Sequence, residues 1–488
     1  MTTTRASQTQ RLRARHVATV SIATLALFAS PTIAAIPSVS PVPSIQDDRL
    51  SEPGVDPGVR FAQASALGAR LVRIDLQWHK VATKKPANGA NQDDPAYDWS
   101  WYDRVVAASA SSGVPILFTV WGTPNWAADP AVAEQASAGT IPLGSASRRP
   151  ASAEDFGAFA RAAATRYAPR GVHNWEAWNE PNIPRFLRPQ FQKVGGTWRN
   201  VSVKVYSDLA KAFYTSVKSV DPNAIIAGLV TAPAGDKCPP SCPAGEHSRT
   251  SPIAFLNELA KPGMQPPMDA VSHHPYPLTL PREGTFKGAS FVDLYNIDFL
   301  TKAVDKTYLK GKPLWLTEFG FATEPVADYK KLIVSQNQQA SLLSDAYRRV
   351  RTNPRVRVFT WYFLQDGQDW RSGLYDRDGG PKLANAAYKL PFSATLTRIK
   401  KGKPVTLLGQ VRPTLTSTAV TIQAKGKKGV FTTIKTLTTS NDGSFALRVK
   451  PAPPTSYRAV WKSQGGETVT SFPVTITIDR GKKGRKKK

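Results

Sequence analysis

Eight short apolar segments alternate along the chain with segments whose hydrophobic spacing suits helices, and this alternation limits the possible folds most. The apolar segments lie at residues 42–46, 70–78, 114–121, 172–178, 224–230, 269–274, 313–319 and 356–363. The helix-like segments lie at 57–67, 101–111, 153–167, 205–220, 253–259, 291–309 and 335–351. Apolar strands separated by helices favour a parallel sheet covered on both faces. Eight such units over about 340 residues predict an α/β fold, a closed (β/α)₈ TIM barrel.

An open, doubly wound sheet is the alternative arrangement of such units. No glycine-rich phosphate loop follows any of the eight segments, which disfavours that alternative. The first segment, 42–46, has the weakest strand pattern. A hydrophobic content of 41% indicates a globular protein, and 488 residues suffice for a barrel plus one further module.

The composition changes after about residue 390, where threonine, valine and lysine become frequent. Short alternating segments lie at 405–409, 419–423, 444–449, 457–461 and 474–478, and Asn441-Asp442-Gly443 is typical of a hairpin turn. This pattern predicts a small all-β sandwich of the immunoglobulin-like type at 391–479, after a barrel domain at 36–390. Such a module could bind sugar, hold the protein on a surface or act as a spacer.

Residues 1–35 have the features of an export signal. Four arginines between positions 5 and 15 precede an uncharged apolar run at 17–29, and Thr32-Ile33-Ala34 supplies small residues for cleavage. A retained membrane anchor is the alternative, but a run of about 13 residues is short for a bilayer. We therefore expect a secreted protein whose mature chain has no transmembrane helix.

Two cysteines, Cys238 and Cys242, lie in a proline-rich loop. In an exported protein such a pair predicts a local disulfide. A metal site is the weaker interpretation, because His247 is the only nearby histidine in the sequence.

The net charge of +28 is concentrated at the C-terminal end. Residues 391–488 hold 20 Lys and Arg against 3 acids, and residues 480–488 form a basic tail. Such a tail attracts polyanions, which outside a cell include anionic cell-wall polymers. Nucleic acid is the runner-up partner and is not expected for an exported chain. A tail that only solubilises the protein is the third possibility.

Two glutamates follow the fourth and seventh apolar segments in similar settings. Glu180 lies in Trp178-Asn179-Glu180-Pro181-Asn182, and Glu318 lies in Thr317-Glu318-Phe319-Gly320. In a (β/α)₈ barrel both would lie at the carboxyl ends of strands, where the chemistry of this fold takes place. Two such carboxyl groups are what cleavage of a glycosidic bond requires: one protonated for the leaving oxygen and one ionised.

The sequence over residues 43–390 resembles the clan A glycoside hydrolases, which are retaining (β/α)₈ enzymes, in particular families 39 and 5. The resemblance is carried by the two glutamate motifs, residues 97–103, residues 122–127 and His274-Pro275-Tyr276. It implies that Glu180 is the acid/base and Glu318 the nucleophile. It also implies that Asn179 binds the sugar 2-OH and that Tyr276 donates its hydroxyl to Glu318.

Further residues are candidates for the same site. Arg73, on the second strand, is a candidate to bind substrate through its positive charge. Glu176 is expected lower in the barrel than Glu180, as the structural partner of Arg73. Either His273 or His274 could contact sugar, but they lack a third ligand, so no metal and no cofactor are predicted. Aromatic platforms for sugar are sought among Trp121, Trp126, Trp361 and Tyr362, with Trp361 matching the clan's strand-eight tryptophan, and Gln365, Asp366 and Asp369 could line the cleft.

Together these observations predict a secreted retaining O-glycoside hydrolase that acts on β-linked sugars, with carboxyl groups about 5–5.5 Å apart. A separation near 9 Å would indicate an inverting enzyme. A catalytically silent wall-binding protein and a transglycosylase remain the alternatives. Where many relatives have a histidine at the third strand, this chain has Trp121-Gly122-Thr123-Pro124, which leaves the sugar and the linkage open.

Overall fold

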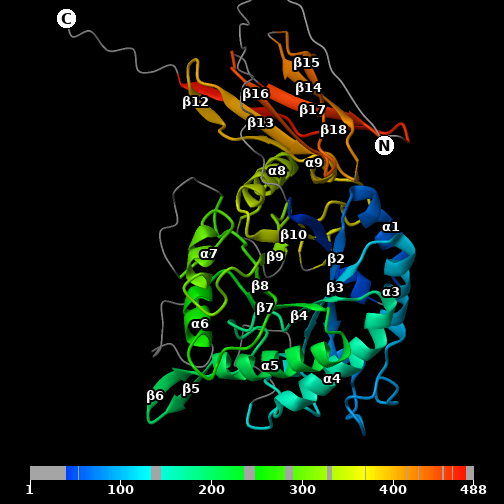
Figure 1. Cartoon of the computed structure of the whole chain (residues 1–488), viewed down its shortest axis with the longest axis vertical. Coiled ribbons are helices and arrows are strands. Elements are labelled where there is room, and N and C mark those ends of the chain that lie inside the picture. Colours follow the sequence, from blue (N-terminus) through cyan, green and yellow to red (C-terminus); the bar gives the residue numbers. More distant parts are fainter. Residues whose placement is uncertain are drawn as a thin grey trace, which may run out of the picture. The chain divides into compact units, whose positions relative to one another are not determined.

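The computed structural model describes residues 40–52, 54–132, 144–235, 248–280, 290–326, 332–368, 370–414, 416–426, 428–452, 456–463 and 465–479. In this part of the chain, eight strands form a closed barrel (Figure 1). They are β1 (Val42–Gln46), β2 (Leu71–Gln77), β3 (Ile116–Trp121), β4 (Asn174–Ala177), β7 (Ile225–Thr231), β8 (Ala270–His273), β9 (Leu314–Phe319) and β10 (Val356–Tyr362).

All eight strand pairs are parallel, and β1 closes the ring by pairing with both β2 and β10. The predicted (β/α)₈ barrel is therefore confirmed, including its weakest segment. β1 is held in the barrel by strand pairing on both sides: Ser44 pairs with Leu71 of β2 on one side and with Thr360 of β10 on the other. The eight predicted strands agree with the observed ones to within two residues at either end.

Helices surround the strands (Figure 1). They are α1 (Pro57–Leu67), α2 (Trp78–Val81), α3 (Ser100–Ser112), α4 (Ala153–Tyr167), α5 (Ser202–Val220), α6 (Pro252–Leu259), α7 (Asp298–Val304), α8 (Gln336–Thr352) and α9 (Leu383–Lys389). Their ends follow ordinary capping chemistry. The Asp56 side chain accepts from the Gly58 amide before α1, and Ser335 and Gln338 form a capping box before α8.

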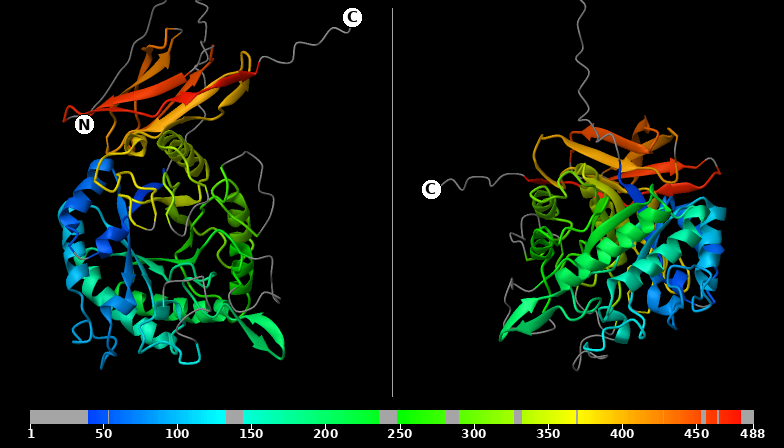
Figure 2. Two further views of the ribbon diagram at one scale, coloured as in Figure 1. Left: turned by 180° about the vertical axis from the view of Figure 1, so that it is seen from behind. Right: turned by 60° about the horizontal axis from the view of Figure 1, so that its bottom comes forward.

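Two local predictions were wrong or incomplete. The helix expected over 291–309 is limited to α7, because Asp293 accepts hydrogen bonds from the amides of Tyr295 and Asn296 and holds a turn there. A hairpin of β5 (Phe191–Val194) and β6 (Thr197–Asn200) was not anticipated (Figure 2). Its turn is Gly195-Gly196, with φ of 57° and 80°, a conformation that favours glycine.

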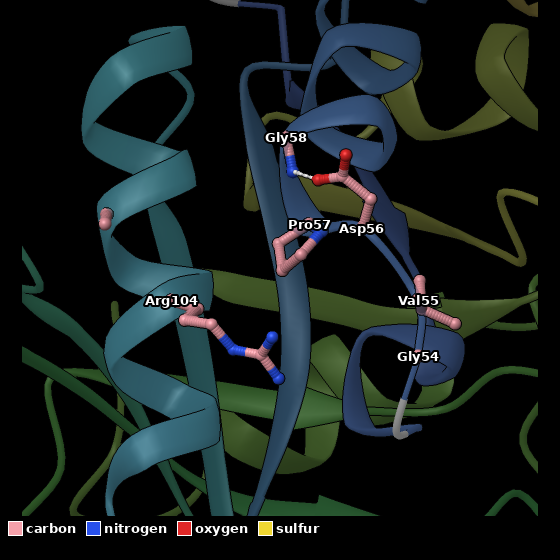
Figure 3. Close-up of a pocket in the computed structure, with 7 residues that line it drawn as sticks. Gly54, Val55, Asp56, Pro57, Gly58 and Arg104 are labelled. Carbon is pink, nitrogen blue, oxygen red and sulfur yellow. Dashed lines mark hydrogen bonds between the residues drawn. The ribbon is translucent and has the colours of Figure 1, made fainter.

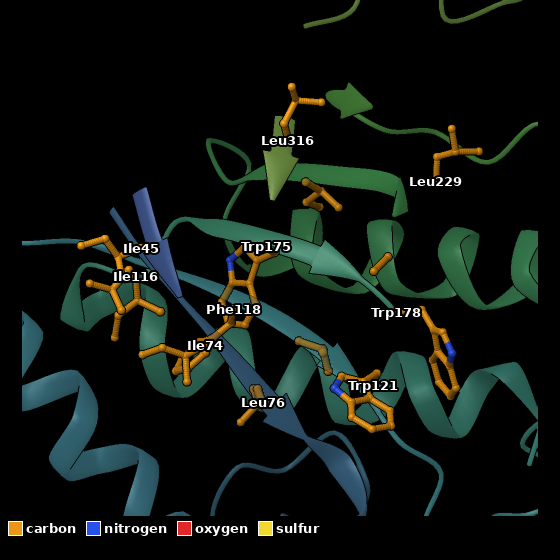
Figure 4. Packing of buried hydrophobic residues seen from close by; sticks show 14 of the residues in the cluster. Ile45, Ile74, Leu76, Ile116, Phe118, Trp121, Trp175, Trp178, Leu229 and Leu316 are labelled. Carbon is orange, nitrogen blue, oxygen red and sulfur yellow. The ribbon is translucent and has the colours of Figure 1, made fainter. Parts of the chain in front are cut away.

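The barrel strands bury both faces. Outward residues such as Ile74, Phe118 and Trp175 pack between strands and helices (Figure 4). Inward residues near the amino ends of the strands form a separate apolar layer, here called the barrel floor: Val42, Leu71, Leu117, Ala227, Ala270, Trp315 and Val358. The next inward positions toward the carboxyl ends are polar. The inward-facing side chains at those carboxyl ends are called the rim.

The β-sandwich predicted for the C-terminal region is also confirmed. Its strands are β11 (Phe392–Ala394), β12 (Arg398–Lys400), β13 (Val405–Gln410), β14 (Ala419–Lys425), β15 (Phe431–Thr438), β16 (Ser444–Val449), β17 (Ser456–Lys462), β18 (Thr468–Thr470), β19 (Val474–Thr475) and β20 (Thr477–Asp479). The sheets β11–β13–β16 and β15–β14–β17–β18 share one apolar core that includes Leu407, Val420, Ile422 and Trp461. Strand β15 escaped prediction because most of its residues are exposed, which removes the alternating pattern.

Several predictions concern residues outside the described ranges: the signal at 1–35, the Cys238–Cys242 disulfide, Asp369 and the basic tail at 480–488. They stay predictions. Among the helices that the structure does describe, none combines the length and the apolar character needed to cross a membrane.

Candidate active site

The segment after β4 turns sharply and brings Asn179 and Glu180 to the rim. Trp178 and Glu180 have φ of 73° and 40°, and the neighbouring Leu229 and Val230 have φ of 72° and 39°. Non-glycine residues rarely adopt such values, and where they do, the surrounding structure must hold them. Here the amide of Glu180 donates to the Val230 carbonyl at 2.9 Å, and Trp178 is fully buried. The local backbone is thus fixed to aim one carboxyl group.

Glu180 and Glu318 face each other across the barrel opening. Nδ1 of His274 lies 2.9 Å from Oε1 of Glu180 and 3.6 Å from Oε2 of Glu318. One carboxylate oxygen of Glu180 and one of Glu318 lie within 4.8 Å of each other. This distance is near the 5–5.5 Å of retaining glycosidases and far from the 9 Å that leaves room for a water between the carboxyl groups. Each side chain keeps about a tenth of its surface open, 12% for Glu180 and 11% for Glu318.

A fully buried guanidinium lies beneath the pair. Arg73 donates from Nη1 to Glu318 Oε1 at 2.6 Å, from Nη2 to Asn179 Oδ1 at 2.9 Å and from Nε to Glu176 Oε2 at 2.8 Å. Glu176 is the predicted floor-side partner, and that pairing is confirmed. The hydroxyls of Thr119 and Ser272 also donate to Glu176, at 2.7 and 2.6 Å. Several hydrogen bonds thus stabilise this buried charge pair, as buried ions require.

Glu318 has one further donor, the Tyr276 hydroxyl, at 3.1 Å from Oε2. Tyr276 is partly exposed and can reach a ligand. Arg73 and His274 cannot, because both side chains are completely buried. The prediction that these two bind substrate directly is therefore corrected: they act through the two glutamates. Asn179 is 3% exposed, and its Oδ1 is taken by Arg73, so only its Nδ2 remains for a sugar hydroxyl.

Burial dominates the acid–base properties of the site. It raises the pKa of Glu180 to about 7, against the opposing charges of Arg185 and Arg73. It also raises the pKa of Glu318 to about 7, although His274 and Arg73 lower it. The pKa of the nucleophile candidate is thus raised as well as that of the acid/base candidate. Two such close carboxyl groups resist double ionisation, so near neutral pH they hold about one proton between them.

The contacts indicate where that proton resides. Glu318 has an ion pair with Arg73 and a hydrogen bond from Tyr276, both of which stabilise its carboxylate. Among the residues that the structure describes, the side-chain hydrogen-bond partner of Glu180 is the imidazole of His274, whose own pKa is lowered by burial. We therefore assign the charge to Glu318 and the proton to Glu180, which are the states that the resemblance implies.

The strand-eight aromatic residue at the rim is Tyr362, and the prediction for Trp361 is corrected. Trp361 has the parity of Phe359 and points outward, where it is fully buried, touches Phe319 and donates to the Ser372 carbonyl at 2.9 Å. Tyr362 has the parity of the inward Val358 and stays partly exposed. Its ring lies edge-on to Tyr276, and its hydroxyl donates to Asp48 at 2.9 Å. Only the inward residue can meet a sugar.

The other aromatic candidates are mostly structural. Trp121 is inward but only 3% exposed, and its indole N–H donates to Asp75 at 2.9 Å. Trp126 packs edge-on against Trp78 and donates to the Ala82 carbonyl. The Trp121 ring therefore offers little face to a ligand, and the Trp126 ring is held by its contact with Trp78.

The remaining polar candidates are already bonded. His273 is fully buried and contacts the Thr231 hydroxyl and the Val292 carbonyl, each at 2.9 Å. Asp366 pairs with Lys382 at 3.0 Å, and Gln365 Oε1 accepts from Arg60. These contacts tie the loop after β10 to its neighbours rather than to a ligand.

Sequence reasoning missed two acids of the rim, Asp48 and Asp75. Gln46 of β1 pairs with Arg73 of β2. Asp48 lies two residues after Gln46, and Asp75 lies two residues after Arg73. Burial, followed by the mutual repulsion of the two, raises the pKa of Asp48 to about 7. The spacing Arg73-Ile74-Asp75 was a usable signal, because residues two apart on a strand share a face.

Glu180, His274 and Glu318 are also close enough to hold a metal ion within the described ranges. Arg73, at 2.6 Å from Glu318, opposes a second cation there. The absence of a metal stays a prediction. A separate surface depression lies between the start of α1 and α3, but its lining, which includes Asp56 and Arg104, contains neither glutamate (Figure 3). The Asp56 carboxylate is already used to cap α1.

No protein-family model and no curated protein matches the sequence. Among solved structures, it is similar to a glucosidase from Croceicoccus marinus (13% identity, 80% of this chain, 89% of the other, TM-score 0.48). It is also similar to an α-L-arabinofuranosidase from Thermotoga maritima (11% identity, 85% of this chain, 95% of the other, TM-score 0.43). A third similar structure is a β-glucosidase from Exiguobacterium marinum (13% identity, 67% of this chain, 84% of the other, TM-score 0.44). The barrel itself is established by the strand pairing described above.

Proposed function

We propose that this protein is a retaining O-glycoside hydrolase with Glu180 as acid/base and Glu318 as nucleophile. The observation that carries the proposal is the pair itself: two partly open carboxyl groups at strand ends, with oxygens within 4.8 Å, in unequal electrostatic settings. Cleavage of a glycosidic bond with retention needs one protonated and one ionised carboxyl group at about this separation.

The reaction then proceeds in two displacements. Glu180 gives its proton to the glycosidic oxygen while Glu318 attacks the anomeric carbon, which releases the leaving sugar and forms a glycosyl ester. Glu180, now ionised, takes a proton from water, and the resulting hydroxide attacks the anomeric carbon and frees Glu318. Arg73 remains paired with the Glu318 carboxylate before and after the cycle and favours its departure as an anion. The free Nδ2 of Asn179 is suited to the sugar 2-OH.

Turnover of a panel of aryl β-glycosides and soluble β-glycans tests this proposal. Wild type should hydrolyse at least one member, and Glu318→Gln should not. Asp221→Asn is a matched control, because Asp221 pairs with His173 at the opposite, amino end of the barrel. Equal and negligible rates for wild type and Glu318→Gln on the whole panel would support the alternative of a silent carbohydrate-binding protein.

A transglycosylase shares the first displacement and differs only in the acceptor. Product analysis with a large excess of oligosaccharide acceptor separates the two: hydrolysis products should dominate for a hydrolase, whereas lengthened products would identify a transglycosylase.

We further propose that the protein is exported and that its basic C-terminal region binds an anionic wall polymer. The charge of residues 391–488 supports this proposal. Removal of residues 480–488 should weaken retention on anionic wall material at low salt and leave turnover of soluble substrate intact. Unchanged retention would argue that the tail only solubilises the chain.

A further inference from the structure

We propose that Asp75, together with Asp48, selects the sugar unit in the site: the pair accepts hydrogen bonds from hydroxyl groups of a neutral sugar and excludes a uronic acid. This inference rests on the proposed function. It concerns two acids at the side of the rim formed by β1 and β2, neither of which takes part in the two displacements.

The first support is the position of the two acids. Asp75 lies two residues beyond Arg73 on β2 and shares its inward face. Asp48 begins the short 3-10 helix that follows β1 and accepts hydrogen bonds from Gln46 and Tyr362. Asp75 contributes to the electrostatics of both Glu180 and Glu318, so it belongs to the same site. Its side chain is 15% exposed, more open than either glutamate, and so within reach of a ligand.

The second support is an unsatisfied atom. Oδ2 of Asp75 accepts from Trp121 at 2.9 Å, but Oδ1 is buried and has no hydrogen-bond donor among the described residues. Its nearest cation, Arg73 Nη1, lies 3.8 Å away and is already bonded to Glu318. A buried carboxylate oxygen without a donor is costly, and a sugar hydroxyl would supply the missing hydrogen bond.

The third support is the local charge. Arg73 is within ion-pair distance of three carboxylates, those of Asp75, Glu176 and Glu318. The Gln46 amide and the Tyr362 hydroxyl donate to the Asp48 carboxylate. One guanidinium therefore faces three carboxylates at this side of the rim, in a chain with a net charge of +28. An anionic sugar would meet repulsion there, even if the basic tail attracts an anionic polymer.

Matched substrates test the proposal: aryl β-glucoside against β-glucuronide, and aryl β-galactoside against β-galacturonide. Wild type should prefer the neutral member of a pair by at least about 100-fold in kcat/KM. Asp75→Asn should lower kcat/KM for the neutral sugar by on the order of 10- to 100-fold, since it weakens a charged hydrogen bond. It should also shift the neutral-to-uronide ratio at least about tenfold toward the uronide. Asp48→Asn should shift the ratio in the same direction, and Asp221→Asn should leave it unchanged.

Failure of this inference can be told from failure of the proposed function. If Glu318→Gln is inactive while Asp75→Asn and Asp48→Asn leave the ratio within about twofold, selection by the pair is refuted and the hydrolase stands. If no aryl glycoside is turned over, calorimetric titration with cellotriose, laminaritriose and trigalacturonate replaces the kinetic comparison. Stronger binding of a neutral trisaccharide, lost in Asp75→Asn, supports the pair; equal or stronger binding of trigalacturonate, or binding of none, overturns it.

Discussion

The floor and the rim of the barrel are built from the same strands, yet their chemistry is opposite. At the floor, residues such as Leu71, Leu117 and Trp315 fill the interior with apolar side chains. Two residues further along two of these strands, Arg73 and Thr119 begin a bonded polar network. The floor stabilises the fold, while the rim holds carboxyl groups whose burial costs stability. Substitutions at the two ends should therefore separate folding from activity.

The largest effect on activity is expected from Glu318→Gln at the rim. The amide cannot attack the anomeric carbon, so kcat should fall by about 10⁴-fold or more. Thermal unfolding should show that the variant is folded, with a loss limited to the Arg73 ion pair. A folded variant that keeps a tenth of the wild-type rate would contradict the nucleophile assignment.

Glu180→Ala should have an effect that depends on the leaving group. General acid catalysis contributes about 10²–10⁴-fold, so hydrolysis of alkyl or sugar leaving groups should fall by that factor. A dinitrophenyl leaving group needs no proton, and its departure should be nearly unaffected. Added azide, as a substitute nucleophile, should restore turnover and give a β-glycosyl azide. An equal loss for all leaving groups would point to a role in binding.

Most of the difference between the floor and the rim could be predicted from the sequence. Where the prediction failed, the failure has a physical cause. The strand count fixed the rim positions of Glu180 and Glu318, because the carboxyl ends of parallel strands meet at one face. The side chains at the ends of strands were harder. The neighbours Trp361 and Tyr362 are both aromatic, and only the strand register decides which one points inward. The burial that raises the pKa of Glu318 comes from several distant segments, so no local motif reports it.

Trp315→Ala tests the floor. Removing a large buried ring should cost about 3–5 kcal/mol of unfolding free energy, because the surrounding floor closes the cavity only partly. Chemical denaturation measures this loss. At a temperature where the variant is folded, kcat/KM should stay within about threefold of wild type, since no rim contact is removed. A loss of activity without a loss of stability would show that the two ends are coupled.

The pH profile sharpens the assignment at the rim. Activity needs Glu180 protonated and Glu318 ionised, and the pKa of each is raised to about 7. kcat/KM should therefore peak near pH 7 and fall about tenfold per unit as pH rises further, when the acid proton is lost. It should also fall as pH decreases and Glu318 takes up a proton. With Glu180→Ala and a dinitrophenyl glycoside, the alkaline decline should disappear. Persistence of that decline would assign it to another group.

The smallest expected effect separates two neighbours that differ only in direction. Tyr362→Phe removes the hydroxyl that donates to Asp48 at the rim and should lower kcat/KM by roughly tenfold, with little change in stability. Trp361→Phe removes buried volume and the hydrogen bond to Ser372 on the outward side, and should lower the melting temperature while kcat/KM stays within about threefold. The opposite result, in which Trp361→Phe loses activity and Tyr362→Phe loses stability, would show that Trp361 and not Tyr362 faces inward at the carboxyl end of β10. The pair therefore tests the alternation that sets the sugar-facing wall of the site.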